Sequence, residues 1–251
     1  MIRLPNFVFV AIVVVTTLGS VNAGGFISNL PKDGTRVVYS LKWVAIESDA
    51  ADGNVPDLDS APKIELEIAS VGKGPNIKGK PTRWIEMVNH MVKGGKERTQ
   101  VSVCLFSESQ LTREKYAMES LIKGATQRLP SQDINLDTDY IKDIERTPFP
   151  LMVGTKPKSL KELGQKTLSL LEKKYECDGL QTVIEDKESG FTVQLEAYYS
   201  DDVPFGLVKA TLLLKESTRV LTTEIKLTEI KQGAKPSIPL EKIVSPAKEK
   251  E

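Results

Sequence analysis

The sequence has few of the residues that build common metal centres: one histidine and two cysteines in 251 residues. One histidine excludes multi-histidine metal sites, and two cysteines exclude zinc or iron–sulfur centres held by four thiolates. A net charge is also absent, since 34 Lys and Arg balance 34 Asp and Glu. Nucleic-acid binders meet the phosphate backbone with a clear basic excess. We therefore expect no nucleic-acid partner, no metal and no cofactor.

Motifs of catalysis are missing as well. No G-x-S-x-G nucleophile elbow occurs, and a Cys–His nucleophile would have to combine His90 with Cys104. Residues 133–139 begin like a calcium-binding EF-hand loop, but Thr138 and Ile144 stand where Gly and Glu are required. A loose calcium contact there stays open beside a plain polar loop. The sequence predicts a protein that is not an enzyme.

The amino terminus has the pattern of a secretory signal peptide. Arg3 precedes an apolar, β-branched run at residues 7–18, and small residues at Val21 and Ala23 suit cleavage after Ala23. The alternative is a membrane anchor, but a spanning helix needs roughly 20 apolar residues. We therefore expect residues 1–23 to be removed and the mature chain to be periplasmic or secreted.

Export to an oxidising compartment would allow the two cysteines to form a disulfide. In an oxidising compartment Cys104 and Cys177 are candidates for a disulfide. The alternative is a pair of buried free thiols, which behave as small apolar side chains. The sequence leaves both open.

Most of the remaining chain alternates with a period of two, which is typical of half-buried strands. The content of 40% hydrophobic and 27% charged residues indicates a folded globular chain rather than a disordered one. Strands are predicted over residues 36–46, 63–70, 190–200, 207–215 and 219–230.

The clearest local prediction is a β-hairpin around Gly94 and Gly95. Two glycines between β-rich runs favour a two-residue turn, in a register where Trp84 faces Leu105 and Ile85 faces Cys104. This register places Trp84, Val88, Val101, Val103 and Leu105 on one face, and Ile85, Met87, Met91, Cys104 and Phe106 on the other. Because both faces are apolar, we expect the sheet to be covered on both sides in its middle.

Helices are predicted in two places. Residues 108–125 show an apolar stripe at helical spacing that ends at Gly124. Residues 159–176 are ambiguous, and we favour a short helix followed by a strand near 166–171. From residue 232 onward, prolines and the charged end of the chain predict a disordered tail.

Together these elements predict an α+β protein that is mainly antiparallel β. About nine strands should curl into a half-open barrel, with one or two helices packed against its concave face. The predicted organisation is a signal peptide over 1–23, one β-rich half-barrel domain over 24–231 and a disordered tail over 232–251. Such barrel mouths are common ligand sites.

Three segments of the C-terminal half carry a resemblance to a known family. They are YECDG at residues 175–179, GFTVQLEAYYSDD at 190–202 and VPFGLVKA at 203–210. Their order is similar to a pattern in exported bacterial proteins of uncharacterised function whose fold resembles the LolA and LolB lipoprotein carriers. The resemblance covers residues 35–230, is specific only at VPFG and its flanks, and implies a LolA-like curved sheet enclosing helices, with no known enzymatic activity. It transfers no functional residue.

VPFG also has a local interpretation. Pro204 fixes φ and Gly206 permits positive φ, which suits a sharp entry into the next strand, with Phe205 plugging the core. Ligand contact by this turn is the alternative role.

The leading hypothesis is an exported, non-catalytic protein that binds an apolar or amphipathic ligand, such as a lipid or a lipoprotein. Peripheral membrane contact is compatible with it. The alternative is a structural or interaction module of the cell envelope with a self-filled core and no small ligand. The residues expected to line the cavity are Trp43, Trp84, Val88 and Phe205.

Overall fold

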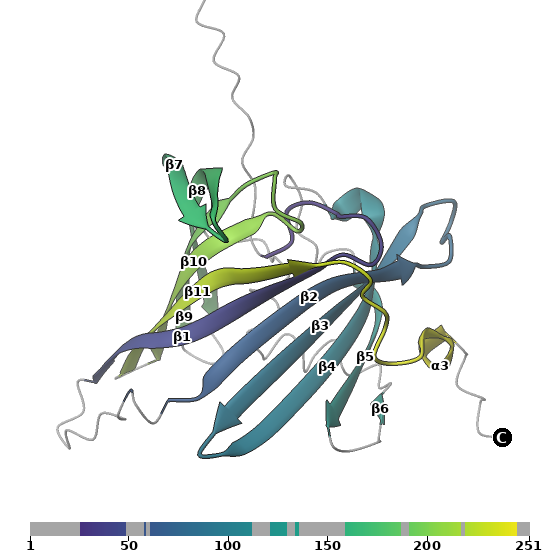
Figure 1. The fold of residues 1–251 in the computed structure, drawn as a ribbon, viewed down its shortest axis with the longest axis horizontal. Coiled ribbons are helices and arrows are strands. Elements are labelled where there is room, and N and C mark those ends of the chain that lie inside the picture. The colour runs from purple at the N-terminus through teal and green to yellow at the C-terminus, as the bar shows by residue number, and fades with distance from the viewer. Residues whose placement is uncertain are drawn as a thin grey trace, which may run out of the picture.

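A computed structural model describes residues 26–48, 58, 61–111, 121–129, 134–135, 159–186, 191–216 and 219–244. The predicted signal peptide lies outside these residues. Eleven strands within them form one antiparallel sheet (Figure 1). The strands are β1 Arg36–Ser48, β2 Lys63–Lys73, β3 Thr82–Lys93, β4 Lys96–Ser107, β5 Leu121–Leu129, β6 Ile134–Asn135, β7 Ser159–Leu170, β8 Lys173–Asp186, β9 Phe191–Tyr199, β10 Leu207–Glu216 and β11 Arg219–Lys231.

The sheet consists of two antiparallel meanders joined along β1. Its strand order is β6-β5-β4-β3-β2-β1-β11-β10-β9-β8-β7. Arg36 on β1 pairs with Ala69 on β2 and, on the other side, with Lys231 on β11. The first strand, β1, and the last strand, β11, are therefore neighbours in the middle of the sheet.

The predicted hairpin is confirmed in register and in turn. Trp84 pairs with Leu105 and Ile85 with Cys104, as the alternation requires. Gly94 and Gly95 both have positive φ, at 57° and 74°. These are the angles of a two-residue turn whose twist matches that of the flanking strands.

Each face of the sheet carries its own apolar core. The first core cluster takes Cys104 from β4 and Tyr175 from β8, although most of the sheet lies between these strands. Its members come from β1 to β4 and from β8 to β11, and they lie on the face around which the sheet curls, the concave face (Figure 1). The second cluster, which contains Trp84, Val88, Val101, Val103 and Leu105, lies on the convex face. The prediction that the middle of the sheet is covered on both sides is confirmed.

The helix predicted over residues 108–125 is wrong at its C-terminal end. Glu108–Gln110 form a single 3-10 turn, and Leu121–Leu129 form β5. Gly124, expected to stop the helix, pairs with Cys104 in the middle of a strand pair. An exposed edge of β4 offers backbone partners along its length, and this pairing outweighs a weak helical stripe. Residues 112–120 lie outside the described part.

The short helix favoured within residues 159–176 is also wrong. Residues 159–170 pair with β8 from end to end. Leu171 and Glu172 make the turn with φ of 51° and 60°, angles that usually call for Gly or Asn. Without those residues the turn has no local sequence signal.

The tail predicted to be disordered is ordered as far as Val244. We call residues 232–244 the C-terminal strap; it ends in a short helix, α3, Leu240–Val244. Ile238 and Ile243 are buried in the second core cluster, so the strap and α3 cover the convex face. Within the described residues no helix packs on the concave face, so the predicted helices there are not shown.

Candidate functional site

The concave face is the best candidate for a binding surface because its lining is apolar over most of its width. Directly paired residues of antiparallel strands share a face, so the printed registers define rows that cross the trough. One such row joins Leu41, Ile225, Ala210, Ala197 and Leu180. All five side chains belong to the first core cluster.

One end of the trough is closed by two crossing segments. Residues 26–35 run against the VPFG turn, where Ser28 donates from its backbone N–H and its hydroxyl to the Phe205 carbonyl, at 2.8 and 3.2 Å. Asn29 donates to the Val203 carbonyl at 3.1 Å. Phe205 is fully buried, which confirms its predicted role as a core plug. We call this the closed end.

The conformation of the turn explains the residues that form it. Gly206 has a φ of 92°, as its predicted role requires, and Phe205 itself has a φ of 65°. Pro204 precedes them in the turn. Left-handed backbone is unfavourable for phenylalanine, so burial of its ring and the bonds to its carbonyl must offset that cost.

A buried hydroxyl ties the closed end to the middle of the sheet. Tyr39 donates to the Leu207 carbonyl at 3.1 Å, and its ring packs against Phe26 with centroids 5.7 Å apart. Burial raises the pKa of Tyr39 well above its ordinary value, and the neighbouring Tyr199 raises it further. The hydroxyl therefore stays protonated and acts as a donor, not as a base.

The opposite end of the trough is less covered. Five concave-face side chains there are half-buried: Ile64, Met91, Leu212, Leu214 and Leu221. Ile64 and Leu212 pack against the first core cluster from its margin. We call this the open end. Apolar burial is thus less complete at the open end, although Val193 and Leu195, which pair with Leu214 and Leu212, are fully buried there.

The four residues expected to line one cavity lie on two different faces. Phe205 plugs the closed end, and Trp43 is half-buried opposite Thr223, on the concave side. Trp84 and Val88 lie under the strap on the convex face. The hairpin register separated its two faces correctly, but which face curls inward depends on strands far away in the sequence.

The two cysteines are free thiols, so the disulfide alternative is not what the structure shows. Both side chains are buried in the first core cluster, on β4 and β8. In the sheet order these strands are separated by β3, β2, β1, β11, β10 and β9. Burial raises the pKa of Cys104, while burial followed by the charges of Glu176 and Asp178 raises the pKa of Cys177 to about 11.

We expect neither thiol to react with iodoacetamide in the folded protein at pH 8. A thiol with a pKa of about 11 is a thiolate in only about one molecule in a thousand at that pH, and the thiolate is the nucleophile. Mass spectrometry should find no added carbamidomethyl group in the folded protein and two after unfolding in guanidinium. Rapid labelling of either cysteine without denaturant would contradict the buried, protonated state.

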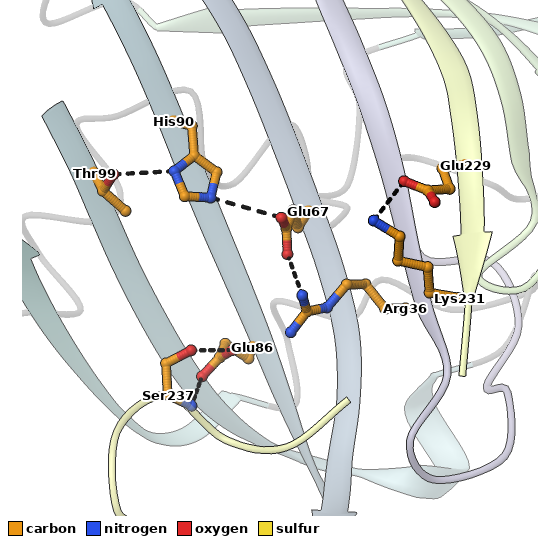
Figure 2. A network of polar contacts seen from close by, with 8 residues as sticks. All are labelled: Arg36, Glu67, Glu86, His90, Thr99, Glu229, Lys231 and Ser237. Atoms are coloured by element: carbon orange, nitrogen blue, oxygen red, sulfur yellow. Dashed lines mark hydrogen bonds and ion pairs between the residues drawn. The ribbon is translucent and has the colours of Figure 1, made fainter. Parts of the chain in front are cut away.

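A chain of polar contacts crosses the convex face from β1 to β4 (Figure 2). Arg36 Nη1 lies 2.9 Å from one Glu67 oxygen, and His90 Nε2 lies 3.6 Å from the other. His90 Nδ1 shares a hydrogen bond of 3.0 Å with Thr99 Oγ1. Because Cys104 pairs with Ile85 and His90 pairs with Thr99, the His90 and Cys104 side chains lie on opposite faces of the sheet.

Glu86 holds the strap beside this chain of contacts. Its two carboxylate oxygens accept from the Ser237 backbone N–H at 2.6 Å and from the Ser237 hydroxyl at 2.9 Å (Figure 2). Burial raises the pKa of Glu86, against the opposing effects of Ser237 and Arg36. A buried acid on an apolar face requires such a partner. An acid between Trp84 and Val88 on one apolar face indicates that some polar group covers it, but nothing local identifies that group as Ser237, and sequence reasoning missed the strap.

Two small pockets lie on the described surface. One, of about 180 Å³, lies between β7, β8 and the turn after β9, and its lining is Gln165, Glu176, Cys177, Asp178, Tyr199, Ser200, Asp201 and Asp202. The other, of about 370 Å³, is lined by Lys73, Gly74, Asn76, Pro81, Thr82 and Glu108. Neither lining contains the histidine. In the described part of the chain no group of His, Cys, Asp and Glu is placed to hold a metal ion.

The helices within the described ranges are too short and too polar to cross a bilayer.

No family model and no curated protein matches the chain. Several solved structures are similar to it, among them the following three. A putative lipoprotein from Parabacteroides distasonis is 12% identical, with a TM-score of 0.37 over 83% of this chain and 99% of that one. A putative exported protein with a YmcC-like fold from Bacteroides fragilis is 7% identical, with a TM-score of 0.35 over 82% and 99%. A beta-barrel-like protein of a domain of unknown function from Brucella abortus is 10% identical, with a TM-score of 0.23 over 79% and 97%.

Proposed function

We propose that the protein is an exported, non-catalytic binding protein that holds an apolar or amphipathic ligand, such as a lipid or a lipidated partner, against its concave face. The observation that carries this proposal is the apolar trough that is closed at one end and half-covered at the other. A ligand entering at the open end would add cover to Leu212, Met91 and their neighbours. Burying a fully exposed side chain of this size contributes about 1.5–3 kcal/mol, and each of these half-buried side chains would gain the remaining part of it.

The chemistry of the described residues supports binding rather than catalysis. Both thiols are buried with raised pKa values, and the histidine lies on the opposite face of the sheet. The buried tyrosine hydroxyl is committed to a backbone carbonyl. Export is supported by the amino-terminal pattern of residues 1–23.

A second candidate function is an interaction module of the envelope with a self-filled core. One observation favours it: concave-face residues such as Val37, Tyr39 and Phe106 are already fully buried without any ligand. This candidate predicts that the trough takes up no small molecule. The experiment below separates the two.

We expect the purified protein to bind a fluorescent long-chain fatty acid, and Leu212→Glu to weaken that binding about tenfold or more. Loss of a buried leucine contact, at about 1.5–3 kcal/mol, corresponds to a change of that size. Binding is measured by fluorescence titration. Native mass spectrometry of protein from an exporting host should also retain co-purifying lipid.

Leu213→Glu is the matched control. Leu213 is the next residue on β10, is also half-buried, and points to the opposite face, where it pairs with Thr222 and Gln194. It should leave the affinity unchanged, with thermal unfolding showing that both variants fold. An equal loss of affinity in the two variants, or no binding by the unaltered protein, would count against the concave-face site.

A further inference from the structure

One row of the trough contains a buried polar group. The register joins Trp43, Thr223, Leu212, Leu195, Thr182 and Leu160 across the concave face. Thr182 is only 1% exposed. Its hydroxyl has no hydrogen-bond partner among the residues that the structure describes.

An unpartnered buried hydroxyl is costly, at about 1–3 kcal/mol. Valine has almost the same shape as threonine and would fill this strand position without that cost. Tyr39 shows how the fold treats a buried hydroxyl of purely structural use, since it donates to the Leu207 carbonyl. Thr182 therefore has the properties of a group whose partner is a ligand.

The surroundings of Thr182 define the chemistry of that partner. Its paired neighbours, Leu195 and Leu160, are apolar, and the next row places the Glu162 carboxylate opposite Leu180. No cation faces Thr182 from its paired residues. A carboxylate buried here would be uncompensated, whereas a neutral ester or alcohol oxygen needs only the hydroxyl.

We propose that Thr182 binds a neutral oxygen, such as an ester carbonyl, of an acyl ligand in the trough, and so selects acyl esters over plain hydrocarbons. This inference rests on the proposed function. In this arrangement Thr182 determines specificity, and the polar part of the ligand lies in the open half of the trough.

The test uses displacement of the bound fluorescent fatty acid by a long-chain methyl ester and by an alkane of equal length. The unaltered protein should prefer the ester about tenfold, which is the gain expected from satisfying a buried hydroxyl. Thr182→Val should lose that preference while binding the alkane as before, and its free form should melt at a higher temperature. Thr182→Ser, which keeps the hydroxyl, should retain the preference for the ester.

Thr223→Val is the matched control. Thr223 lies in the same row and is 5% exposed, and its hydroxyl is not one of the buried, unpartnered groups of the described residues. It should leave the preference for the ester unchanged. If the unaltered protein binds neither compound, the proposed function fails. If it binds both and Thr182→Val keeps the ester preference, or loses both ligands equally, only the role of Thr182 is overturned.

Discussion

Gly206→Ala is expected to destabilise the protein by about 3 kcal/mol or more, because two penalties combine at one position. The φ of 92° at Gly206 is unfavourable for any residue with a Cβ atom. That Cβ would also overlap the hydroxyl oxygen of Ser28 and lie 3.2 Å from its Cβ. Ser28 could yield only by giving up its hydroxyl bond to the Phe205 carbonyl. Urea unfolding measures the loss.

Gly94→Ala separates the two penalties. Gly94 also has positive φ, at 57°, but a Cβ atom there would meet no other atom within 4 Å. It should therefore show only the backbone cost, about 1 kcal/mol. If Gly206→Ala and Gly94→Ala lose the same free energy of unfolding, segment 26–35 does not press on the VPFG turn as described.

Ile238→Ala is the second large effect, with an expected loss of about 2–5 kcal/mol. Ile238 is fully buried between the strap and the convex face, so truncation leaves a cavity over β3 and β4. It also weakens the position of Ser237, whose two hydrogen bonds neutralise the cost of burying Glu86. Urea unfolding gives the loss, and hydrogen exchange should show faster opening of amides in residues 234–244.

Lys235→Ala is the control within the same segment, because Lys235 is exposed. It should change the free energy of unfolding by less than about 0.5 kcal/mol. Comparable losses in the two variants, or unchanged exchange in Ile238→Ala, would mean that the strap does not pack on the sheet.

Local pattern was enough to predict the best-defined strands. Alternation and the Gly94–Gly95 turn specified the β3–β4 register residue by residue, because a slip by one position would exchange two different apolar faces. The same logic holds for β2, β9, β10 and β11. In these strands the alternation of apolar and polar residues, and the turn residues beside them, can be seen in the local sequence.

The remaining elements depend on partners far away in the sequence. Leu121–Leu129 forms a strand because its backbone pairs with the edge of β4. Ser159–Leu170 forms a strand because its backbone pairs with β8. The strap is held by Glu86, 151 residues before Ser237, and no local pattern encodes such a contact. For the site, the sequence identified apolar faces and Phe205 as a plug, but curvature decided that Trp84 and Val88 lie outside the trough.

The pairing of β1 with β11 has a consequence for how the chain reaches this structure. Arg36 pairs with Lys231, so the central β1–β11 ladder cannot form until the chain as far as β11 is available. Contacts this distant pay the entropy of a very long loop and are typical of slow folders. A nascent chain should thus lack this central ladder, and stay accessible to chaperones, until β11 has been made, although local hairpins such as β3–β4 can form earlier.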